Sequence, residues 1–145
     1  MKKAIVSGAN GFVGSAVIKE LVLQGYEVYA LARENHHDQV PINEMVRIIP
    51  FSLENIEALG EVIPVNEYEA FYHFAWNGSA GADRADMALQ LKNAQWTVEC
   101  LQMAKRLGCK RFVPAGSIVE HETIAAVYTQ GNRPGAGYIY GSGKV

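Results

Sequence analysis

The sequence contains 145 residues, of which 49% are hydrophobic and 19% are charged, and its formal net charge is -2. These values describe a globular domain with a buried core, and they exclude a disordered chain or one that attracts nucleic acid through its charge. No apolar run reaches the ~20 residues of a membrane span, and the N-terminus lacks the apolar core of a secretory signal. Cys100 and Cys109 show no metal-binding spacing. We therefore expect one cytoplasmic domain that binds no metal, nucleic acid or membrane.

Short apolar segments alternate with longer amphipathic segments along the chain. Five of the short segments are rich in β-branched and aromatic residues and are predicted to be strands: Ala4–Ser7, Val28–Ala32, Val46–Phe51, Ala70–Phe74 and Arg111–Pro114. Buried parallel strands that are joined by helices produce this alternation. The sequence therefore predicts an α/β fold of the Rossmann type, a doubly wound parallel sheet of about five strands.

A first helix is predicted over Gly11–Gln24, and Gly25 is expected to end it. Its packing face is predicted to consist of Val13, Ala16, Val17 and Leu21.

The turn between the first strand and this helix contains Gly8, Gly11 and Gly14 in the spacing GxxGxxG. Glycine lets the backbone turn tightly here and brings N–H groups close to a phosphate at the start of the helix. The commonest dinucleotide fingerprint, GxGxxG, is spaced differently, and an ordinary strand-to-helix turn is the alternative. We interpret the turn as the pyrophosphate site of a dinucleotide cofactor, formed by Gly8, Asn10, Gly11, Phe12, Val13 and Gly14.

The second predicted strand ends at Ala32, where folds that prefer NAD usually carry a carboxylate for the ribose hydroxyls. The next residue, Arg33, offers a guanidinium that can pair with a 2′-phosphate. NADP is therefore the predicted cofactor, with NAD as the alternative, although a solvated surface arginine also fits the pattern. His36 and His37 are expected to be exposed loop residues.

The longest helical pattern covers Arg84–Leu107 and ends before Gly108. Steps of four and three residues separate its apolar residues Met87, Leu91, Ala94, Val98 and Leu101. We expect this stripe to pack on the sheet, and contact with a helix of another subunit is the alternative. The composition of Gly131–Gly137 predicts a loop.

Four motifs in a fixed order give the chain a specific resemblance. They are the glycine turn, His73-Phe74-Ala75, Phe112-Val113-Pro114-Ala115-Gly116-Ser117 and Tyr140-Gly141-Ser142-Gly143-Lys144. On these motifs the chain resembles the N-terminal part of an extended short-chain dehydrogenase/reductase of the NAD(P)-dependent nucleotide-sugar epimerase/dehydratase family. The resemblance spans essentially the whole chain.

The resemblance implies roles for single residues. The catalytic residues that it implies are Ser117, Tyr140 and Lys144. The residues that it places beside the cofactor are Phe74, Ala75 and Asn93. Ser52 and Leu53 stand where the family usually has an acidic residue near the adenine, and Trp76 stands where it often has a small residue. We include these three in the candidate cofactor site.

The spacing of Tyr140 and Lys144 supports these roles independently. Tyrosine, with a reference pKa of about 10, needs a nearby cation before it can act as a base at neutral pH. Residues four apart share one face of a helix. Tyr140 would move the proton, and Ser117 would donate a hydrogen bond to the substrate oxygen. Lys144 would also bind the nicotinamide ribose, and the cofactor would move the hydride.

Two departures from the family narrow the prediction. Dehydratases of the family follow the serine position with an Asp-Glu pair, and here Ile118 and Val119 follow Ser117, which disfavours dehydration. Family members also continue well beyond the motif lysine with a substrate domain, whereas this chain ends at Val145. Because a helix of about six residues is unstable alone, we expect Tyr140 and Lys144 to be poorly ordered or displaced and the chain to show little or no turnover.

The predicted function is an NAD(P)-dependent epimerase or reductase of a small molecule, expected to be a nucleotide sugar. A reductase of a non-sugar carbonyl and a non-enzymatic, redox-sensing module that binds NADP(H) are the alternatives. The resemblance also implies a homodimer formed through the helix at Arg84–Leu107.

Overall fold

The computed structural model describes residues 1–129 and 136–145, which form two compact units. The first unit comprises Met1–Ala75 and Val98–Ala115, and the second comprises Trp76–Thr97 and Gly116–Val145. Most of the loop predicted over 131–137 lies outside the described residues, and its last two residues belong to a helix.

The first unit contains a five-stranded sheet in which every neighbouring pair of strands is parallel. The strands are β1 (Lys3–Ser7), β2 (Glu27–Ala32), β3 (Val46–Pro50), β4 (Ala70–His73) and β5 (Phe112–Pro114). Their order, β3-β2-β1-β4-β5, matches five of the six strands of the Rossmann order 3-2-1-4-5-6. The predicted fold class and all five predicted strands are confirmed, because no strand end moves by more than one residue.

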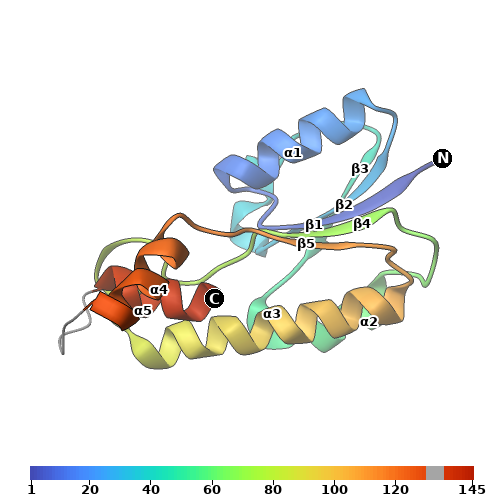
Figure 1. The fold of residues 1–145 in the computed structure, drawn as a ribbon. Helices are drawn as coiled ribbons and strands as arrows, with labels where there is room; N and C mark the ends of the chain where they lie inside the picture. The colour runs from blue at the N-terminus through green and yellow to red at the C-terminus, as the bar shows by residue number, and fades with distance from the viewer. Residues whose placement is uncertain (130–135) are drawn as a thin grey trace. The chain divides into compact units, whose positions relative to one another are not determined.

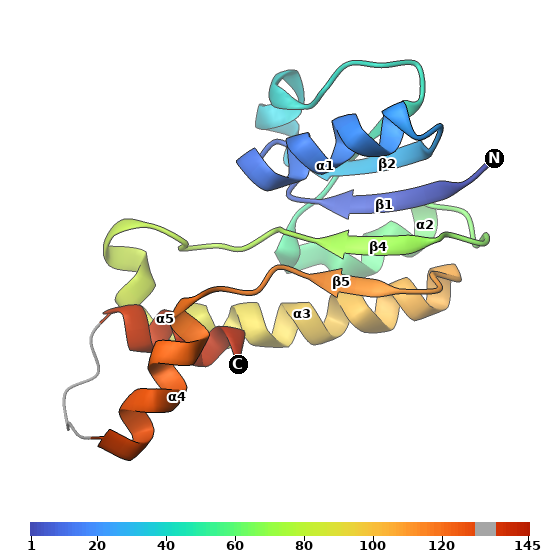
Figure 2. The same ribbon diagram turned by 45° about the horizontal axis from the view of Figure 1, so that its top comes forward.

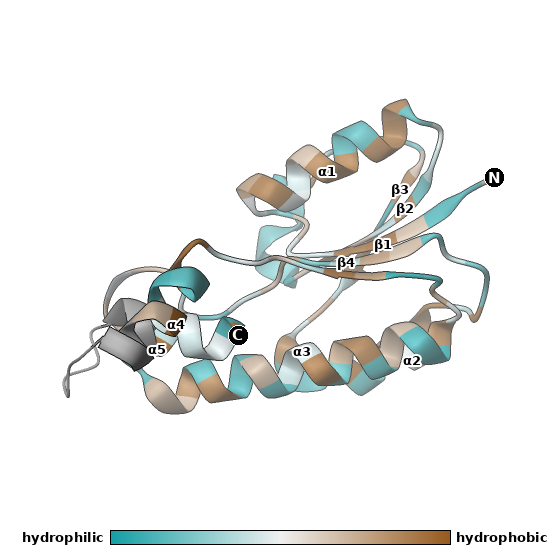
Figure 3. Cartoon of the chain, in the orientation of Figure 1, coloured by the Kyte–Doolittle hydropathy of each residue, from teal (hydrophilic) through white to brown (hydrophobic). Residues whose placement is uncertain are grey.

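Helices cover both faces of this sheet (Figures 1 and 2). Helix α1 (Phe12–Leu23) lies on one face, and the other face is covered by α2 (Leu59–Val62) and the second half of α3 (Met87–Leu107). Two 3-10 helices, η1 (Glu34–Gln39) and η2 (Leu53–Ala58), complete the unit. The central strands carry hydrophobic residues on both faces (Figure 3), as burial between two helical layers requires.

The buried face of α1 differs from the predicted one. Gly14, Ile18 and Leu21 are buried, whereas Val13 is 51% exposed and Ala16 is also exposed. The cause is steric, because Gly14 approaches the carbonyl group of Gly8 so closely that no side chain fits between them. This contact sets the rotation of the helix, and counting apolar residues alone does not reveal it.

The predicted packing stripe of α3 is also wrong. Four of its five members are exposed, at 58%, 71%, 53% and 47% for Met87, Leu91, Val98 and Leu101. The buried residues of the helix are instead Gln90, Asn93, Trp96, Cys100, Met103, Ala104 and Leu107. Gln90 and Asn93 are buried because the segment that follows β4 forms hydrogen bonds with their side chains. Hydrophobicity alone therefore does not identify the buried face of α3.

The second unit is helical. It contains the 3-10 helix η3 (Gly81–Ala85), the first half of α3, α4 (Val119–Thr129) and α5 (Ala136–Lys144). The sequence did not predict α4, and it placed Tyr140 at the start of a short helix. Helix α5 in fact begins four residues earlier, so Tyr140 lies in its middle.

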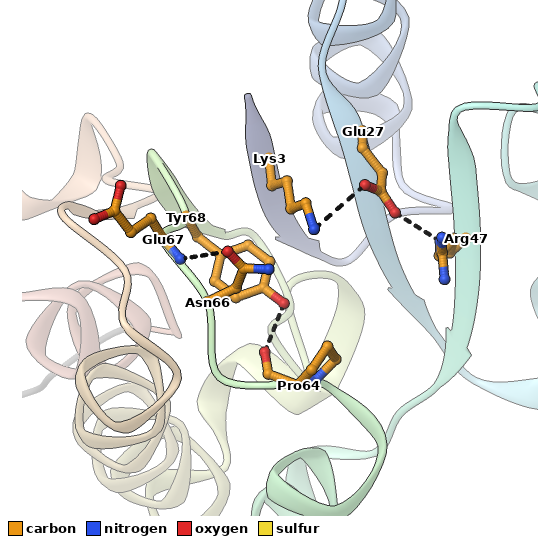
Figure 4. A network of polar contacts seen from close by, with 7 residues as sticks. All are labelled: Lys3, Glu27, Arg47, Pro64, Asn66, Glu67 and Tyr68. Carbon is orange, nitrogen blue, oxygen red and sulfur yellow. Dashed lines mark hydrogen bonds and ion pairs between the residues drawn. The ribbon is translucent and has the colours of Figure 1, made fainter. Parts of the chain in front are cut away.

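A polar network lies at the amino ends of β1, β2 and β3, the edge of the sheet opposite the glycine turn (Figure 4). The buried carboxylate of Glu27 lies 2.7 Å from Arg47 Nε and 3.7 Å from Lys3 Nζ. Nearby, the Tyr68 hydroxyl donates to the Pro64 carbonyl at 2.8 Å, and burial raises the pKa of that hydroxyl. The two cations offset the charge of the buried Glu27 carboxylate, although its Oε1 atom has no hydrogen-bond partner among the described residues, and the hydroxyl of Tyr68 is satisfied by the Pro64 carbonyl.

Candidate functional site

The glycine turn follows β1 directly, at the carboxyl end of the strand that lies between β2 and β4. Open α/β sheets bind ligands at this kind of topological switch point. Gly8 has a φ of +69°, and a Cβ atom there would lie 2.8 Å from the carbonyl carbon of Phe74. A Cβ atom on Gly14 would overlap the carbonyl oxygen of Gly8. Glycine is therefore sterically required at both positions.

The amino end of α1 suits an anion. Gly11 is the N-cap residue, no side chain caps the helix, and its first turn carries no acidic residue. The first backbone N–H groups of a helix lack partners within the helix and carry partial positive charge. Phe12 and Val13 are exposed at this end, and Asn10 is partly buried in the turn. This end of the first unit therefore fits the pyrophosphate of a dinucleotide.

A buried pair that the sequence analysis missed supports the turn from beneath. Ser7 Oγ lies 3.0 Å from His73 Nδ1, and it accepts hydrogen bonds from the N–H groups of Phe74 at 3.2 Å and Ala75 at 3.3 Å. Because these two N–H groups use the oxygen as an acceptor, the hydroxyl hydrogen points to Nδ1 and the proton of a neutral His73 is on Nε2. Ser7 and His73 are the last residues of the neighbouring strands β1 and β4, so their proximity could have been predicted from the sequence.

Arg33 is exposed and directly follows β2, while Ala32 is buried. The expectation that both following histidines are exposed is wrong: His36 and His37 are partly buried in η1, and His37 Nε2 lies 3.0 Å from the Ala32 carbonyl oxygen. This contact fixes the chain directly beside Arg33.

Ser52 and Leu53 lie at the start of η2. Ser52 caps this helix by accepting from the N–H group of Glu54 at 3.3 Å, and its hydroxyl donates to the Glu54 carboxylate at 2.8 Å. The Leu53 side chain is buried in the core. The structure thus shows structural contacts for both residues.

In the second unit, two buried amides of α3 hold the segment that follows β4. Asn93 Oδ1 accepts from the N–H group of Asn77 at 3.0 Å, and Asn93 Nδ2 donates to the Asn77 carbonyl at 2.7 Å. Gln90 Oε1 accepts from Trp76 Nε1 at 2.9 Å, and Gln90 Nε2 donates to the carbonyl of Gly78 at 2.9 Å. Asn93, predicted beside the cofactor, therefore positions this segment through both ends of its amide.

Tyr140 and Lys144 lie on α5 among aromatic and cationic side chains. The Tyr140 ring meets the edge of the Trp76 ring at 5.8 Å between centroids, and the Arg84 guanidinium carbon lies 4.9 Å from the Tyr140 centroid. Lys144 Nζ lies 3.6 Å from the Trp76 centroid and 5.8 Å from the Tyr140 centroid. Trp76, predicted near the cofactor, thus forms the surface on which the lysine rests.

Burial and charge act on the two predicted catalytic residues in opposite directions. Burial raises the pKa of Tyr140, the Arg84 charge lowers it in part, and Glu120 raises it. Burial lowers the pKa of Lys144 to about 8, and Glu120 opposes that change. A lysine with this pKa exchanges its proton near neutral pH, which a base system of this kind can use.

Ser117 lies at the start of α4 in a capping box with Glu120. Its Oγ accepts from the N–H group of Val119 at 3.3 Å, and the Glu120 carboxylate accepts from the N–H group of Ser117 at 2.7 Å. The hydrogen of the Ser117 hydroxyl is left to donate. The sequence analysis missed Glu120, although the spacing Ser-x-x-Glu before a helix is a known capping signal.

Each unit thus gathers a part of the predicted site. The glycine turn, Phe74, Ala75 and Arg33 belong to the first unit, and Trp76, Asn93, Ser117, Tyr140 and Lys144 belong to the second. No group of three or more metal-ligating side chains occurs among residues 1–129 and 136–145. Within the same ranges, no helix has the length and apolarity to cross a membrane.

A family model described as the NAD dependent epimerase/dehydratase family matches residues 4–139. The chain belongs to this family. This confirms the resemblance that its motifs indicate. A dTDP-6-deoxy-L-talose 4-dehydrogenase (NAD(+)) of Aggregatibacter actinomycetemcomitans is 30% identical over 118 residues, which are 80% of this epimerase/dehydratase chain and 42% of that protein. The chain therefore spans less than half the length of that relative.

Solved structures share the fold of this chain. The enzyme WbmH of Bordetella bronchiseptica, in complex with NAD+, is similar with a TM-score of 0.75 at 19% identity, over 99% of this chain and 49% of its own. A UDP-glucose 4-epimerase of Thermotoga maritima, with UDP-glucose, is similar with a TM-score of 0.66 at 21% identity, over 79% and 38%. At these identities the likeness concerns the fold.

Proposed function

We propose that this chain is the cofactor-binding part of an NAD(P)-dependent epimerase or reductase that acts on a nucleotide sugar. The glycine turn carries the proposal, because Gly8 and Gly14 leave no room for side chains and the uncapped end of α1 offers N–H groups to a pyrophosphate. Relatives whose names include a dTDP-sugar or UDP-glucose support a nucleotide sugar as the substrate class.

The chain's own residues supply the proton chemistry of this proposal. Tyr140 in its phenolate form takes the proton of a substrate hydroxyl, and the Ser117 hydroxyl donates a hydrogen bond to the same oxygen. Lys144 stays close to Tyr140 on the same helix and is the residue that binds the nicotinamide ribose. The bound dinucleotide supplies the acceptor or donor of hydride.

The cofactor preference is proposed to be NADP, because Arg33 is exposed at the end of β2. The test is a titration of NADPH and NADH that follows the quenching of tryptophan fluorescence. We expect NADPH to bind more tightly and Arg33→Ala to remove most of that difference, while Arg111→Ala, at another exposed arginine, leaves it unchanged. Tighter binding of NADH would contradict the preference, and binding of neither would contradict the proposed cofactor site.

The enzyme proposal is tested by turnover. The protein is incubated with UDP- and dTDP-sugars, and product is followed together with the absorbance of reduced cofactor. Conversion that disappears in Tyr140→Phe supports the proposal. Tight cofactor binding without conversion of any sugar or carbonyl would favour a redox-sensing module instead.

We also propose that α3 forms a homodimer contact through its exposed apolar stripe, Met87, Leu91, Val98 and Leu101. A stripe of this kind on one helix favours burial against a second copy. In sedimentation velocity, Leu91→Glu should give monomers, and Leu23→Glu, at an exposed leucine of α1, should not. A wild-type chain that sediments as a monomer at all concentrations would contradict the dimer.

A further inference from the structure

The cation beside the Tyr140 ring comes from outside the motif that defines the predicted catalytic pair. The Arg84 guanidinium carbon lies 4.9 Å from the Tyr140 centroid, closer than Lys144 Nζ at 5.8 Å. Lys144 Nζ lies instead 3.6 Å from the centroid of Trp76. Arg84 therefore adds a second cation beside the Tyr140 ring, in addition to the lysine that the motif supplies.

Charged groups of two other elements act on the pKa of Tyr140, and only one of them favours the phenolate. Arg84 of η3 lowers the pKa of Tyr140, whereas Glu120 of α4 raises it. Lys144 of α5 has a pKa of about 8, so it loses part of its charge in the pH range where a tyrosine base works. A guanidinium keeps its charge throughout that range.

The position of Arg84 is fixed by the buried side chain of Gln90. Gln90 Nε2 donates to the carbonyl of Asp83, the residue before Arg84, at 3.0 Å. Its Oε1 accepts from Trp76 Nε1 at 2.9 Å, so one amide holds both the arginine loop and the indole beside Tyr140. Among the described residues Arg84 Nε has no hydrogen-bond acceptor.

We propose that Arg84 is a positioning residue that stabilises the Tyr140 phenolate, while Lys144 is held on the Trp76 ring. The inference rests on the proposed function in that it assumes Tyr140 to be the base. Arg84 supplies a charge that persists in the pH range where Lys144 loses part of its own, and so adds to the stabilisation that the motif lysine gives.

The test is a direct titration of Tyr140 by carbon NMR in the 145-residue chain labelled at the tyrosine Cζ, with the signal assigned by Tyr140→Phe. Arg84→Gln is expected to shift the titration of Tyr140 upward. Arg84→Lys should restore most of the wild-type value. In an enzyme that uses this base, each unit of increase in the pKa of Tyr140 lowers the phenolate fraction tenfold at a fixed pH, and the rate should fall in proportion.

Arg106→Gln is the matched control, because it removes the same charge from an exposed ion pair with Glu57. It should leave the Tyr140 titration unchanged. If Arg84→Gln does not fold, Arg84→Met, which keeps the apolar stem, takes its place. An Arg84 variant that leaves the titration unchanged would overturn the proposal. Because no turnover is measured in this titration, a failure of the proposed enzyme activity is seen separately.

Discussion

The glycine turn of the first unit and the tyrosine cluster of the second are held by different kinds of contact. At the turn, backbone atoms approach so closely that only Gly8 and Gly14 fit. Around Tyr140, half-buried side chains meet through ring edges and cations at 4.9 to 5.8 Å. Steric exclusion allows only one residue type at a position, whereas ring and charge contacts can be made by many residue types. The turn can therefore be predicted from the sequence, whereas the residues that contact Tyr140 cannot.

The largest expected effect is that of Gly14→Ala, which tests the steric side of this comparison. The new methyl group would overlap the Gly8 carbonyl oxygen and force α1 away from β1. We expect the free energy of unfolding to fall by about 3 kcal/mol or more, and dinucleotide binding to be lost. Urea unfolding and cofactor titration measure the two effects.

Gly60→Ala is the control for this variant. A Cβ atom there meets only the ends of the Arg106 and Met103 side chains, at 3.6 and 3.7 Å, so the change should be neutral or stabilise by up to about 1 kcal/mol. If Gly14→Ala were as stable as Gly60→Ala and still bound cofactor, the steric account of the turn would be wrong.

Gln90→Met tests the support beneath the tyrosine cluster. Methionine has a similar volume, but it leaves the Trp76 N–H group and the carbonyls of Gly78 and Asp83 without their partners. We expect a loss of about 2 to 3 kcal/mol in the free energy of unfolding, since each unpaired buried group is costly. The same change at the exposed Gln102 should stay within about 0.5 kcal/mol, and an equal loss at both positions would argue against the network.

The errors of the sequence analysis follow from the same comparison. The strands and the glycine turn were predicted well, because burial between two helical layers and steric exclusion leave few acceptable residues. The buried face of α3 was predicted wrongly, because Gln90 and Asn93 are buried for their hydrogen bonds and Leu91 is exposed. Roles that depend on partners distant in sequence, such as Arg84 beside Tyr140, leave no pattern in a single chain.

Ser7→Ala tests the buried side-chain contact beneath the turn. The hydroxyl is fully buried and bonds to His73 Nδ1 and to the N–H groups of Phe74 and Ala75. We expect a loss of about 2 kcal/mol in the free energy of unfolding, together with a changed nitrogen NMR shift of His73 Nδ1 once its donor is gone. Ser15→Ala removes a hydroxyl that donates only to the Phe12 carbonyl, and it should cost less than about 0.5 kcal/mol. A His73 shift that is the same in Ser7→Ala and wild type would contradict the proposed tautomer.

The smallest effect is expected from Lys144→Met, and it appears only as a pH dependence. The pKa of Lys144 is about 8 in the folded chain, against 10.5 for an ordinary lysine, because burial disfavours its charge. Between these values the unfolded chain binds more protons than the folded one, so Lys144 makes the free energy of unfolding rise with pH. Burial raises the pKa of Tyr68 and of both cysteines, which acts in the opposite direction but equally in wild type and variant. The free energy of unfolding of wild type minus that of Lys144→Met should therefore rise between about pH 8 and pH 10.5, and it should stay constant below about pH 8. A difference that stays constant across the window would mean that Lys144 is not buried against Trp76, and the tyrosine cluster would then need another arrangement.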